Sequence, residues 1–151
     1  MVICYIGIGS NLGERQYYIE AAIKKIKTVS STKVTKVSRI IKSLPQGGPL
    51  QNYFFNGVIE IETGLSPYQL LEELQNIEAS LGRIRTVKNY PRTIDLDILT
   101  FGDVLMQEEA LTIPHPRILE RDFVLEPLKE IASEAVRKSL FSPRKSKSQM
   151  L

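Results

Sequence analysis

The chain has 151 residues, 42% of them apolar and 25% charged, which suits one globular domain with a single core. No apolar run approaches the roughly 20 residues that a membrane-spanning helix needs, and the N-terminus lacks the basic flank and cleavage site of a secretory signal. We therefore expect a cytoplasmic protein with no membrane partner. The single cysteine, Cys4, lies in an apolar run and is expected to be a small buried hydrophobe.

The formal net charge of +3 is concentrated at one end of the chain. Five basic residues follow Val136 with no acid among them, so residues 1–136 hold 15 basic and 17 acidic groups. A body with a slightly negative net charge is a poor polyanion-binding surface, and no nucleic-acid partner is expected. We expect a single domain over residues 1–136 and a poorly ordered basic tail over residues 137–151.

The first part of the chain predicts a strand, a turn and a helix. Residues 2–7 form an apolar run typical of a central strand, and the glycine-rich residues 7–13 predict a turn after it. Such a turn can cradle phosphate, but its spacing is neither that of a P-loop nor that of a dinucleotide fingerprint. Apolar residues at helical spacing then predict a packing helix over residues 14–27.

Two alternating segments, residues 33–42 and 53–62, predict strands on either side of a loop. The loop is rich in proline and glycine, and loops held by a rigid sheet often carry binding residues. Phe54 and Asn56 stand at its exit. An aromatic ring there can stack on a flat ligand and an asparagine can read its edge, although core packing is the competing interpretation of the aromatic residues.

A second helix begins with Ser66, Pro67 and Gln69, which match a capping box, and Gly82 ends it. Gln75 and Glu78 form a polar pair near its end, which is also compatible with ordinary solvated surface. The following residues 83–93 carry four cations and no apolar periodicity, which favours a mobile lid.

Asp95 and Asp97 stand two residues apart in an apolar, strand-like run. In a strand they share one face while Ile94, Leu96 and Ile98 share the other. Two neighbouring carboxylates repel unless a cation lies between them, and Mg²⁺ suits such ligands together with phosphate oxygens. The competing interpretation is the solvated face of an edge strand.

The last part of the chain contains the single histidine, His115, between two prolines that fix its backbone. A lone histidine is more often a surface or core residue than a catalyst. Apolar residues from Phe123 to Ile131 then predict a last helix, with Pro127 near its start or at a break.

Taken together, the chain resembles the 6-hydroxymethyl-7,8-dihydropterin pyrophosphokinases of folate biosynthesis over nearly all of its length. The resemblance is carried by four segments in the order of the family, residues 5–13, 54–56, 91–99 and 114–117. It implies an α+β fold, a ferredoxin-like α/β sandwich with a mostly antiparallel sheet flanked by helices. It further implies an enzyme that transfers pyrophosphate from ATP to the pterin hydroxymethyl group with two Mg²⁺, releasing AMP. We expect the protein to be a monomer.

The resemblance also implies the roles of individual residues. Asp95 and Asp97 would hold the metal, and with Arg83 and Arg92 they would be the catalytic residues. The ATP-binding residues would be Gln75, Glu78, Arg85, Arg92, Ile98, Thr112, His115 and Arg121. The pterin-binding residues would be Ser43, Leu44, Gln46, Phe54, Asn56 and Phe123. The chain departs from the family pattern at Lys88-Asn89-Tyr90, at Ser43-Leu44 and at Ala110.

Two other classes of function are weighed against this one. A nucleotidyltransferase also combines a Gly-Ser turn with paired acids, but there the acids follow within about 10 to 15 residues, and here the gap is far longer. A ferredoxin-like regulatory or RNA-binding module would use the sheet and the basic tail. That module leaves the repelling pair Asp95 and Asp97 unexplained.

Overall fold

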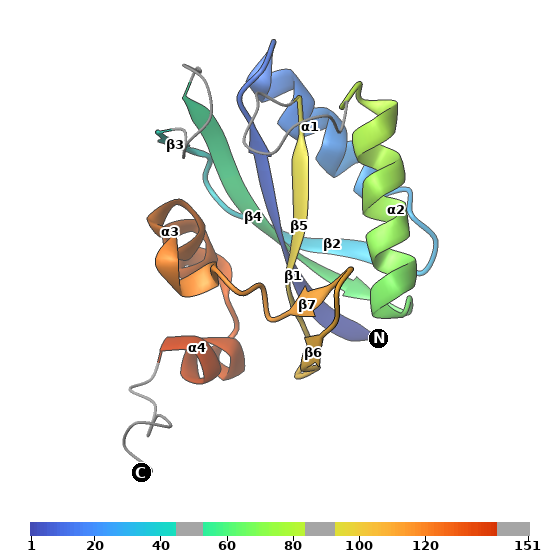
Figure 1. Cartoon of the computed structure of the whole chain (residues 1–151), viewed down its shortest axis with the longest axis vertical. Coiled ribbons are helices and arrows are strands. Elements are labelled where there is room, and N and C mark those ends of the chain that lie inside the picture. The colour runs from blue at the N-terminus through green and yellow to red at the C-terminus, as the bar shows by residue number, and fades with distance from the viewer. Residues whose placement is uncertain (45–52, 84–92, 142–151) are drawn as a thin grey trace.

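A five-stranded antiparallel sheet forms the middle layer of the protein, and helices cover both of its faces (Figure 1). The computed structural model describes residues 1–44, 53–83 and 93–141. The elements in chain order are β1 (Val2–Ser10), α1 (Arg15–Ile26), β2 (Thr32–Val37), β3 (Ile41–Ser43), β4 (Phe54–Thr63), α2 (Pro67–Ser80), β5 (Asp95–Phe101), β6 (Met106–Gln107), β7 (Thr112–Ile113), the 3₁₀ helix η1 (Ile118–Glu120), α3 (Asp122–Ile131) and α4 (Glu134–Phe141).

The strand order is β2-β4-β1-β5, with β3 pairing the far end of β4. The pairs β1–β4, β1–β5, β2–β4 and β3–β4 are all antiparallel. Helix α1 connects β1 to β2, and helix α2 connects β4 to β5. As a result, β1 lies inside the sheet between β4 and β5. This arrangement confirms the predicted ferredoxin-like sandwich.

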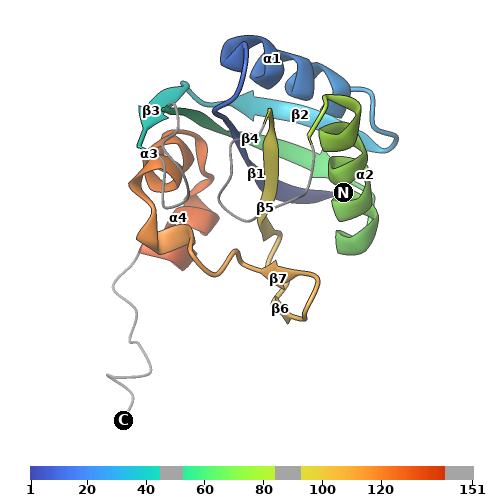
Figure 2. The same ribbon diagram turned by 45° about the horizontal axis from the view of Figure 1, so that its top comes forward.

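The sheet separates two hydrophobic cores (Figure 2). The larger core lies under α1 and α2 and includes Ile6, Leu74 and Ile98. The smaller core lies under α3 and α4, where Tyr5 and Leu99 pack with Leu128. Successive residues of β1 and β5 therefore serve opposite cores, as the alternation of a strand requires.

The first strand is longer than the sequence pattern predicts. β1 continues through Ser10 instead of ending at Gly7, and Gly9 pairs with Asn56 on one side and with Asp95 on the other. The prediction that the turn begins at Gly7 is therefore wrong, because Gly7 and Gly9 both lie in the strand. Backbone pairing with a strand on each side holds this segment extended in spite of its glycines.

The single strand predicted over residues 33–42 is also corrected. It is broken into β2 and β3 at Ser38, whose Oγ accepts a hydrogen bond from the Val58 N–H at 2.8 Å and donates one to Arg39 O at 2.8 Å. A side-chain hydroxyl thus replaces a backbone partner in the ladder. The side chain of Ile40 then packs against Gly57, where a Cβ added to the glycine would lie 2.6 Å from Ile40 Cδ1.

The predicted limits of α2 are confirmed by its caps. Ser66 Oγ accepts a hydrogen bond from Gln69 N–H at 3.2 Å, and Gln69 Oε1 accepts one from Ser66 N–H at 2.8 Å. This reciprocal pair satisfies donors that the first turn of a helix leaves open. Gly82 follows the last turn at φ +87°, a left-handed conformation that favours glycine.

The C-terminal helices differ in part from the prediction. α3 is present, but Pro127 lies in its interior and is buried, neither at its start nor at a break. α4 was not predicted, and it crosses the expected domain boundary at residue 136. Val136 and the buried Leu140, four residues apart, face the smaller core, which explains why this part of the basic segment is helical. The tail expected beyond it, residues 142–151, lies outside the described residues.

Cys4 is buried, as predicted, and burial raises the pKa of its thiol to about 12. A thiol that stays protonated at neutral pH is a poor nucleophile. Within the described part of the chain, none of the helices combines the length and the apolar character needed to cross a membrane.

Candidate active site

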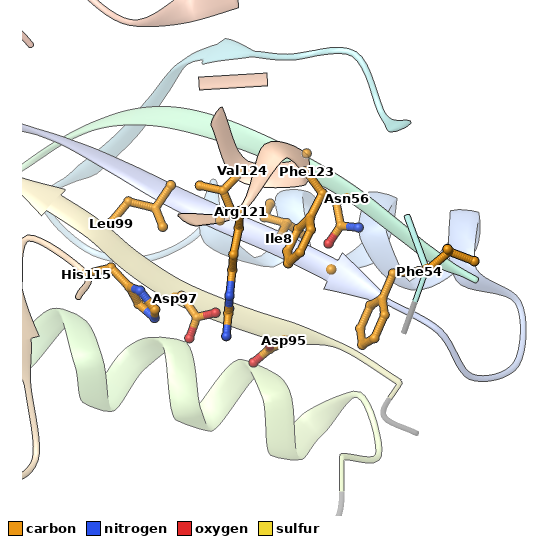
Figure 3. Close-up of a pocket in the computed structure, with 14 residues that line it drawn as sticks. Ile8, Phe54, Asn56, Asp95, Asp97, Leu99, His115, Arg121, Phe123 and Val124 are labelled. Carbon is orange, nitrogen blue, oxygen red and sulfur yellow. The ribbon is translucent and has the colours of Figure 1, made fainter. Parts of the chain in front are cut away.

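A pocket opens on the α3 side of the sheet, where β1, β4 and β5 meet the N-terminal end of α3 (Figure 3). Carboxylates, aromatic rings and the backbone of glycine residues in the strands come together in this pocket. Its lining consists of Gly7, Ile8, Gly9, Leu44, Phe54, Asn56, Gly57, Asp95, Asp97, Leu99, His115, Arg121, Phe123 and Val124.

The floor of the pocket is set by the register of β1 and β5. Gly7 lies opposite Asp97, and Gly9 lies opposite Asp95. Paired residues of neighbouring strands project to the same face, so each carboxylate has a glycine beside it in place of a side chain. The two acids share one face of β5, as their spacing predicts, and both line the pocket, where the glycines leave room above the strand.

The two carboxylates lie in a strongly electrostatic environment. Burial raises the pKa of the Asp97 carboxyl, and the charges of Asp95 and Glu78 raise it further, against the lowering effect of Arg83 and Arg121. Desolvation and like charges both disfavour an ionised acid. A cation at this position would reverse that preference, so the site suits a positively charged ligand.

Arg83 supplies part of the positive charge next to Asp95. Its Nη1 donates to Asp95 Oδ1 at 2.8 Å and to Glu78 Oε2 at 2.7 Å. Glu78 is only 2% exposed, and its Oε2 also accepts the Leu96 N–H at 2.8 Å. The end of α2, the start of the following loop and the first two residues of β5 are thus joined by one buried acid and one arginine.

The other half of the pocket is aromatic and amide-like. Phe54 from β4 and Phe123 from α3 both project toward the pocket, and the side chain of Asn56, also from β4, lies near them (Figure 3). Asn56 Nδ2 donates to Ser43 Oγ at 2.6 Å, which fixes the amide plane. Leu44 also lines the pocket, although its side chain is 68% exposed. Two rings and one oriented amide suit a flat heterocycle with polar edges.

His115 and Arg121 also line the pocket, and His115 lies beside Asp97, at the end away from Phe54 (Figure 3). His115 is held beside β5 because its backbone N–H donates to Leu99 O at 2.8 Å, and its Nδ1 accepts the Arg117 N–H at 3.2 Å. Burial lowers the pKa of the imidazole, and the nearby Arg121 lowers it further. Figure 3 shows Arg121 extending toward Asp95 and Asp97.

The side chains of the pocket limit which divalent metal it could hold. No cluster of three or more His, Cys, Asp or Glu side chains suited to a metal is found within residues 1–44, 53–83 and 93–141. Two carboxylates on one face do fit Mg²⁺, which usually takes one or two carboxylates and completes its shell with water and substrate phosphates. A Zn²⁺-type site, with four protein ligands, does not fit.

Not all the predicted site residues line the pocket. Gln75 is exposed on α2, Ile98 packs into the larger core, and Thr112 donates to Glu108 O at 3.5 Å on the β6–β7 hairpin. Glu78 does not line the pocket either; its carboxylate accepts hydrogen bonds from Arg83 Nη1 and the Leu96 N–H, and its charge raises the pKa of Asp97. Gln46, Arg85, Arg92 and most of the predicted lid over residues 83–93 lie outside the described residues.

Some lining residues were missed from the sequence. Gly7 and Gly9 were noticed only as parts of a turn, and their role becomes visible once their strand partners are known. Leu99 and Val124 carry no chemical signal in the sequence. Leu99 follows Asp97 by two residues and therefore lies on the same face of β5.

Comparison with known proteins gives a consistent result. Residues 5–133 match the family model of 7,8-dihydro-6-hydroxymethylpterin-pyrophosphokinase. The chain is 46% identical over 132 residues to the 2-amino-4-hydroxy-6-hydroxymethyldihydropteridine pyrophosphokinase of Bacillus subtilis, covering 87% of this chain and 79% of that protein. It is 46% identical over 136 residues to the protein of the same name from Haemophilus influenzae, covering 90% and 85%.

A crystal structure of HPPK-DHPS in complex with substrates has a similar fold, with a TM-score of 0.63 and 16% sequence identity. The match covers 86% of this chain and 40% of that one. At this identity the likeness supports the fold alone. The family model and the two bacterial relatives cover most of the chain, and the chain therefore belongs to the 7,8-dihydro-6-hydroxymethylpterin-pyrophosphokinase family.

Proposed function

We propose that the chain transfers the pyrophosphoryl group of ATP to the hydroxymethyl group of 6-hydroxymethyl-7,8-dihydropterin and releases AMP. The observation that carries this proposal is one pocket that joins the carboxylates Asp95 and Asp97 to the rings Phe54 and Phe123. Such a pocket suits a metal-bound polyphosphate at one end and a flat heterocycle at the other. Membership of the family and the names of the bacterial relatives support the same reaction.

In this proposal Asp95 and Asp97 hold Mg²⁺, two ions being expected. When bound, the metal neutralises charge that builds on the phosphate oxygens. Arg121 and Arg83 add fixed positive charge from α3 and from the end of α2. Arg85 and Arg92 are expected to act on the same oxygens, and Gln75, Glu78, Ile98, Thr112 and His115 are proposed to surround the nucleotide. Arginine is suited to this because its planar donors match phosphate geometry.

The pterin is proposed to lie between Phe54 and Phe123, with Asn56 reading its edge and Ser43, Leu44 and Gln46 completing that side. Ser43 Oγ accepts from Asn56 Nδ2, so Asn56 Oδ1 is the atom left to accept a donor from the ring. Orientation of the ring directs its hydroxymethyl group toward the carboxylate end of the pocket. Holding two reactants in line lowers the entropic part of the barrier.

The transfer itself needs little covalent participation by the protein. The hydroxymethyl oxygen forms a bond to the β-phosphorus of ATP, the bond between the β-phosphorus and its bridging oxygen to the α-phosphate breaks, and the hydroxyl proton is released to solvent. Loose phosphoryl transfer depends mainly on position and charge. We therefore propose that no side chain is an obligatory general base.

The nucleotide product of a simple incubation tests the proposal. Protein, Mg²⁺, ATP and 6-hydroxymethyl-7,8-dihydropterin are mixed, and nucleotides are separated by chromatography. Release of AMP in equal amount to the pterin pyrophosphate is expected, while ADP would indicate a simple kinase. Absence of turnover with both ligands bound would favour a non-enzymatic module. Action as a cytoplasmic monomer, with no nucleic-acid or membrane partner, is part of the proposal.

A further inference from the structure

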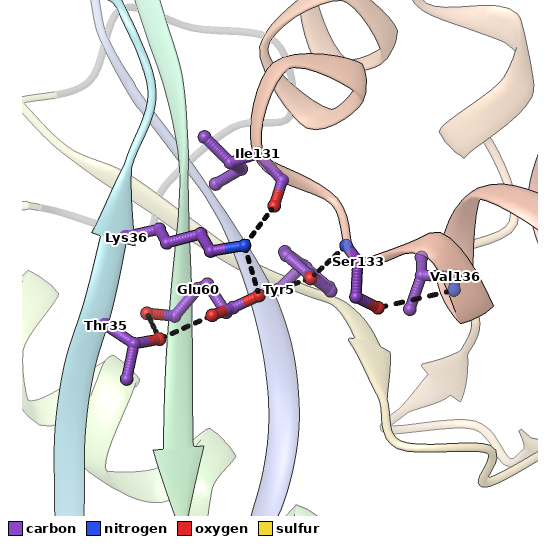
Figure 4. A network of polar contacts seen from close by, with 7 residues as sticks. All are labelled: Tyr5, Thr35, Lys36, Glu60, Ile131, Ser133 and Val136. Carbon is purple, nitrogen blue, oxygen red and sulfur yellow. Dashed lines mark hydrogen bonds and ion pairs between the residues drawn. The ribbon is translucent and has the colours of Figure 1, made fainter.

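A buried polar network lies on the α3 side of the sheet, beyond the end of the pocket (Figure 4). Tyr5 OH donates to Glu60 Oε2 at 2.5 Å and accepts the Ser133 N–H at 2.8 Å. Glu60 Oε1 accepts from Thr35 Oγ1 at 2.7 Å. Tyr5 is fully buried and Glu60 is 5% exposed, so these groups depend on one another for their hydrogen bonds.

The network holds the C-terminal end of α3. Lys36 Nζ donates to the carbonyl oxygen of Ile131, the last residue of α3, at 3.3 Å and lies 3.8 Å from Glu60 Oε2. Ser133, bound by Tyr5, is in the short joint between α3 and α4. Terminal carbonyls of a helix lack partners within the helix, and a cation there is favourable. Lys36 of β2 supplies both a hydrogen-bond donor and a positive charge at this end of α3.

The opposite end of the same helix forms a wall of the pocket. Arg121 is the N-cap of α3, and Phe123 and Val124 in its first turn line the pocket. From Phe123 to Ile131 an α-helix spans about 12 Å. Because one short helix joins these two ends, a shift of its C-terminal end is expected to shift the ring of Phe123 over the sheet.

We infer that Tyr5 and Glu60 are positioning residues for the pterin half of the site, acting through α3 on Phe123. The inference rests on the proposed function, since it takes Phe123 as a pterin contact. Neither Tyr5 nor Glu60 lines the pocket. They set its shape from the far end of the helix.

Tyr5→Phe is the most direct variant, because it keeps the buried ring and removes only the hydroxyl. Glu60 then loses a donor and the Ser133 N–H loses its acceptor, so the end of α3 loses one of the contacts that tie it to the sheet. We expect the dissociation constant for 6-hydroxymethylpterin to rise about tenfold, which corresponds to the loss of one buried hydrogen bond. The measurement is isothermal titration with Mg²⁺ and a non-hydrolysable ATP analogue present, at a temperature where each variant is fully folded.

A double-mutant cycle separates positioning from general destabilisation. In a Phe123→Ala background, Tyr5→Phe is expected to change the dissociation constant less than twofold, since the residue through which it acts is gone. Equal effects of Tyr5→Phe in both backgrounds would overturn the inference. Glu60→Gln, which can still accept from Tyr5, is expected to retain most of the affinity, whereas Glu60→Leu is expected to match Tyr5→Phe.

Thr63→Val is the matched control. Thr63 is a fully buried hydroxyl on the same strand as Glu60, and it binds Thr32 Oγ1 at 2.8 Å away from α3. It is expected to lower the melting temperature without changing pterin affinity. Should Tyr5→Phe fail to fold, Lys36→Met, which removes the half-exposed donor to Ile131, enters the same cycle with the same expected outcomes.

Failure of this inference is distinguishable from failure of the proposed function. If Phe123→Ala leaves pterin affinity unchanged, the proposed pterin site is wrong, and the inference is overturned with it. If Phe123→Ala weakens binding while Tyr5→Phe does not, the site stands and only the positioning role is overturned.

Discussion

Gly9 and Asn56 face one another across β1 and β4, and a methyl group on Gly9 would stand 2.8 Å from Asn56 Oδ1. Contacts below about 3 Å between carbon and oxygen are not tolerated, so one of the two groups would have to move. Asn56 cannot turn away without losing its 2.6 Å hydrogen bond to Ser43 Oγ. The glycine and the amide orientation are thus one feature of the pocket.

Gly9→Ala is therefore expected to weaken pterin binding about tenfold, which corresponds to the loss of one well-oriented hydrogen bond. Titration of the folded variant with 6-hydroxymethylpterin measures it. Gly64→Ala is the control, because a methyl there meets only ordinary contacts, 3.4 Å from Ser31 Cβ and 3.5 Å from Met1 Sδ. Unchanged affinity in Gly9→Ala would mean that Asn56 Oδ1 makes no contact with the ligand.

Arg83 is the cation shared by Glu78 and Asp95, and its side chain is 13% exposed. Arg83→Met leaves a buried carboxylate without its partner, which typically costs about 3–5 kcal/mol for a buried pair. We expect a large fall in the melting temperature of Arg83→Met at pH 7.

The exposed pair Lys138–Glu134 gives a matched comparison for Arg83. It joins residues four apart on α4 at 3.5 Å with most of both side chains in solvent. Lys138→Met is expected to leave thermal unfolding unchanged, because solvent screens such a pair. Equal behaviour of the two variants would show that Arg83 does not hold the end of α2 against β5.

Local rules predicted the parts of the site that depend on the period of a strand or on helix caps. The two-residue spacing of Asp95 and Asp97 placed both on one face, and Ser66 with Gln69 fixed the start of α2. Both features are decided by neighbouring residues in the chain. No long-range contact overrides them.

Features that depend on a distant partner were not predictable in this way. The break at Ser38 requires the N–H of Val58 from another strand, and Glu78 is buried only because Arg83 and Leu96 N–H meet it. For the same reason the sequence leaves Glu78 compatible with ordinary solvated surface as well as with a contact to the nucleotide. α4 escaped prediction because its apolar face is short and lies next to the basic tail.

His115 is expected to titrate below the ordinary pKa of 6.5, since burial and then the charge of Arg121 both disfavour its protonated form. A group with a lowered folded pKa binds fewer protons than in the unfolded chain, so its contribution to stability is full above 6.5 and falls as the pH drops through the lowered value. The single histidine gives one resolvable imidazole signal by NMR. Titration at or above 6.5 would contradict the buried environment.

His115→Ala is expected to raise the KM for ATP while leaving measurable AMP release, because the proposed transfer needs no obligatory side-chain base. His115 is the single conventional candidate for such a base in the sequence. AMP release at varied ATP concentration separates the two parameters. Complete loss of turnover with nucleotide still bound would make His115 the base.

Asp97→Asn separates the chemical role of Asp97 from its effect on stability. The substitution keeps the size of the side chain and removes its charge, so the proposed metal ligand is lost and Mg²⁺-dependent AMP release should fall to background. Asp103→Asn is the control, since Asp103 is exposed in the turn after β5 and is expected to retain full activity. Near-normal activity of Asp97→Asn would remove Asp97 from the metal site.

Although Asp97→Asn is expected to lose activity, its stability without metal is expected to be equal to or higher than that of the parent protein. Burial and the charges of Asp95 and Glu78 raise the pKa of Asp97, so the ionised carboxylate is unfavourable in the folded, metal-free protein. An acid with a raised folded pKa contributes stability that is present below its unfolded pKa, near 4, and is lost as the pH rises through the folded value. With chelator present, Asp97→Asn should therefore unfold at the same temperature as the parent at pH 4 and at an equal or higher temperature at pH 8. A marked loss of metal-free stability at pH 8 would instead make Asp97 a structural residue of β5, held by contacts that an amide cannot replace.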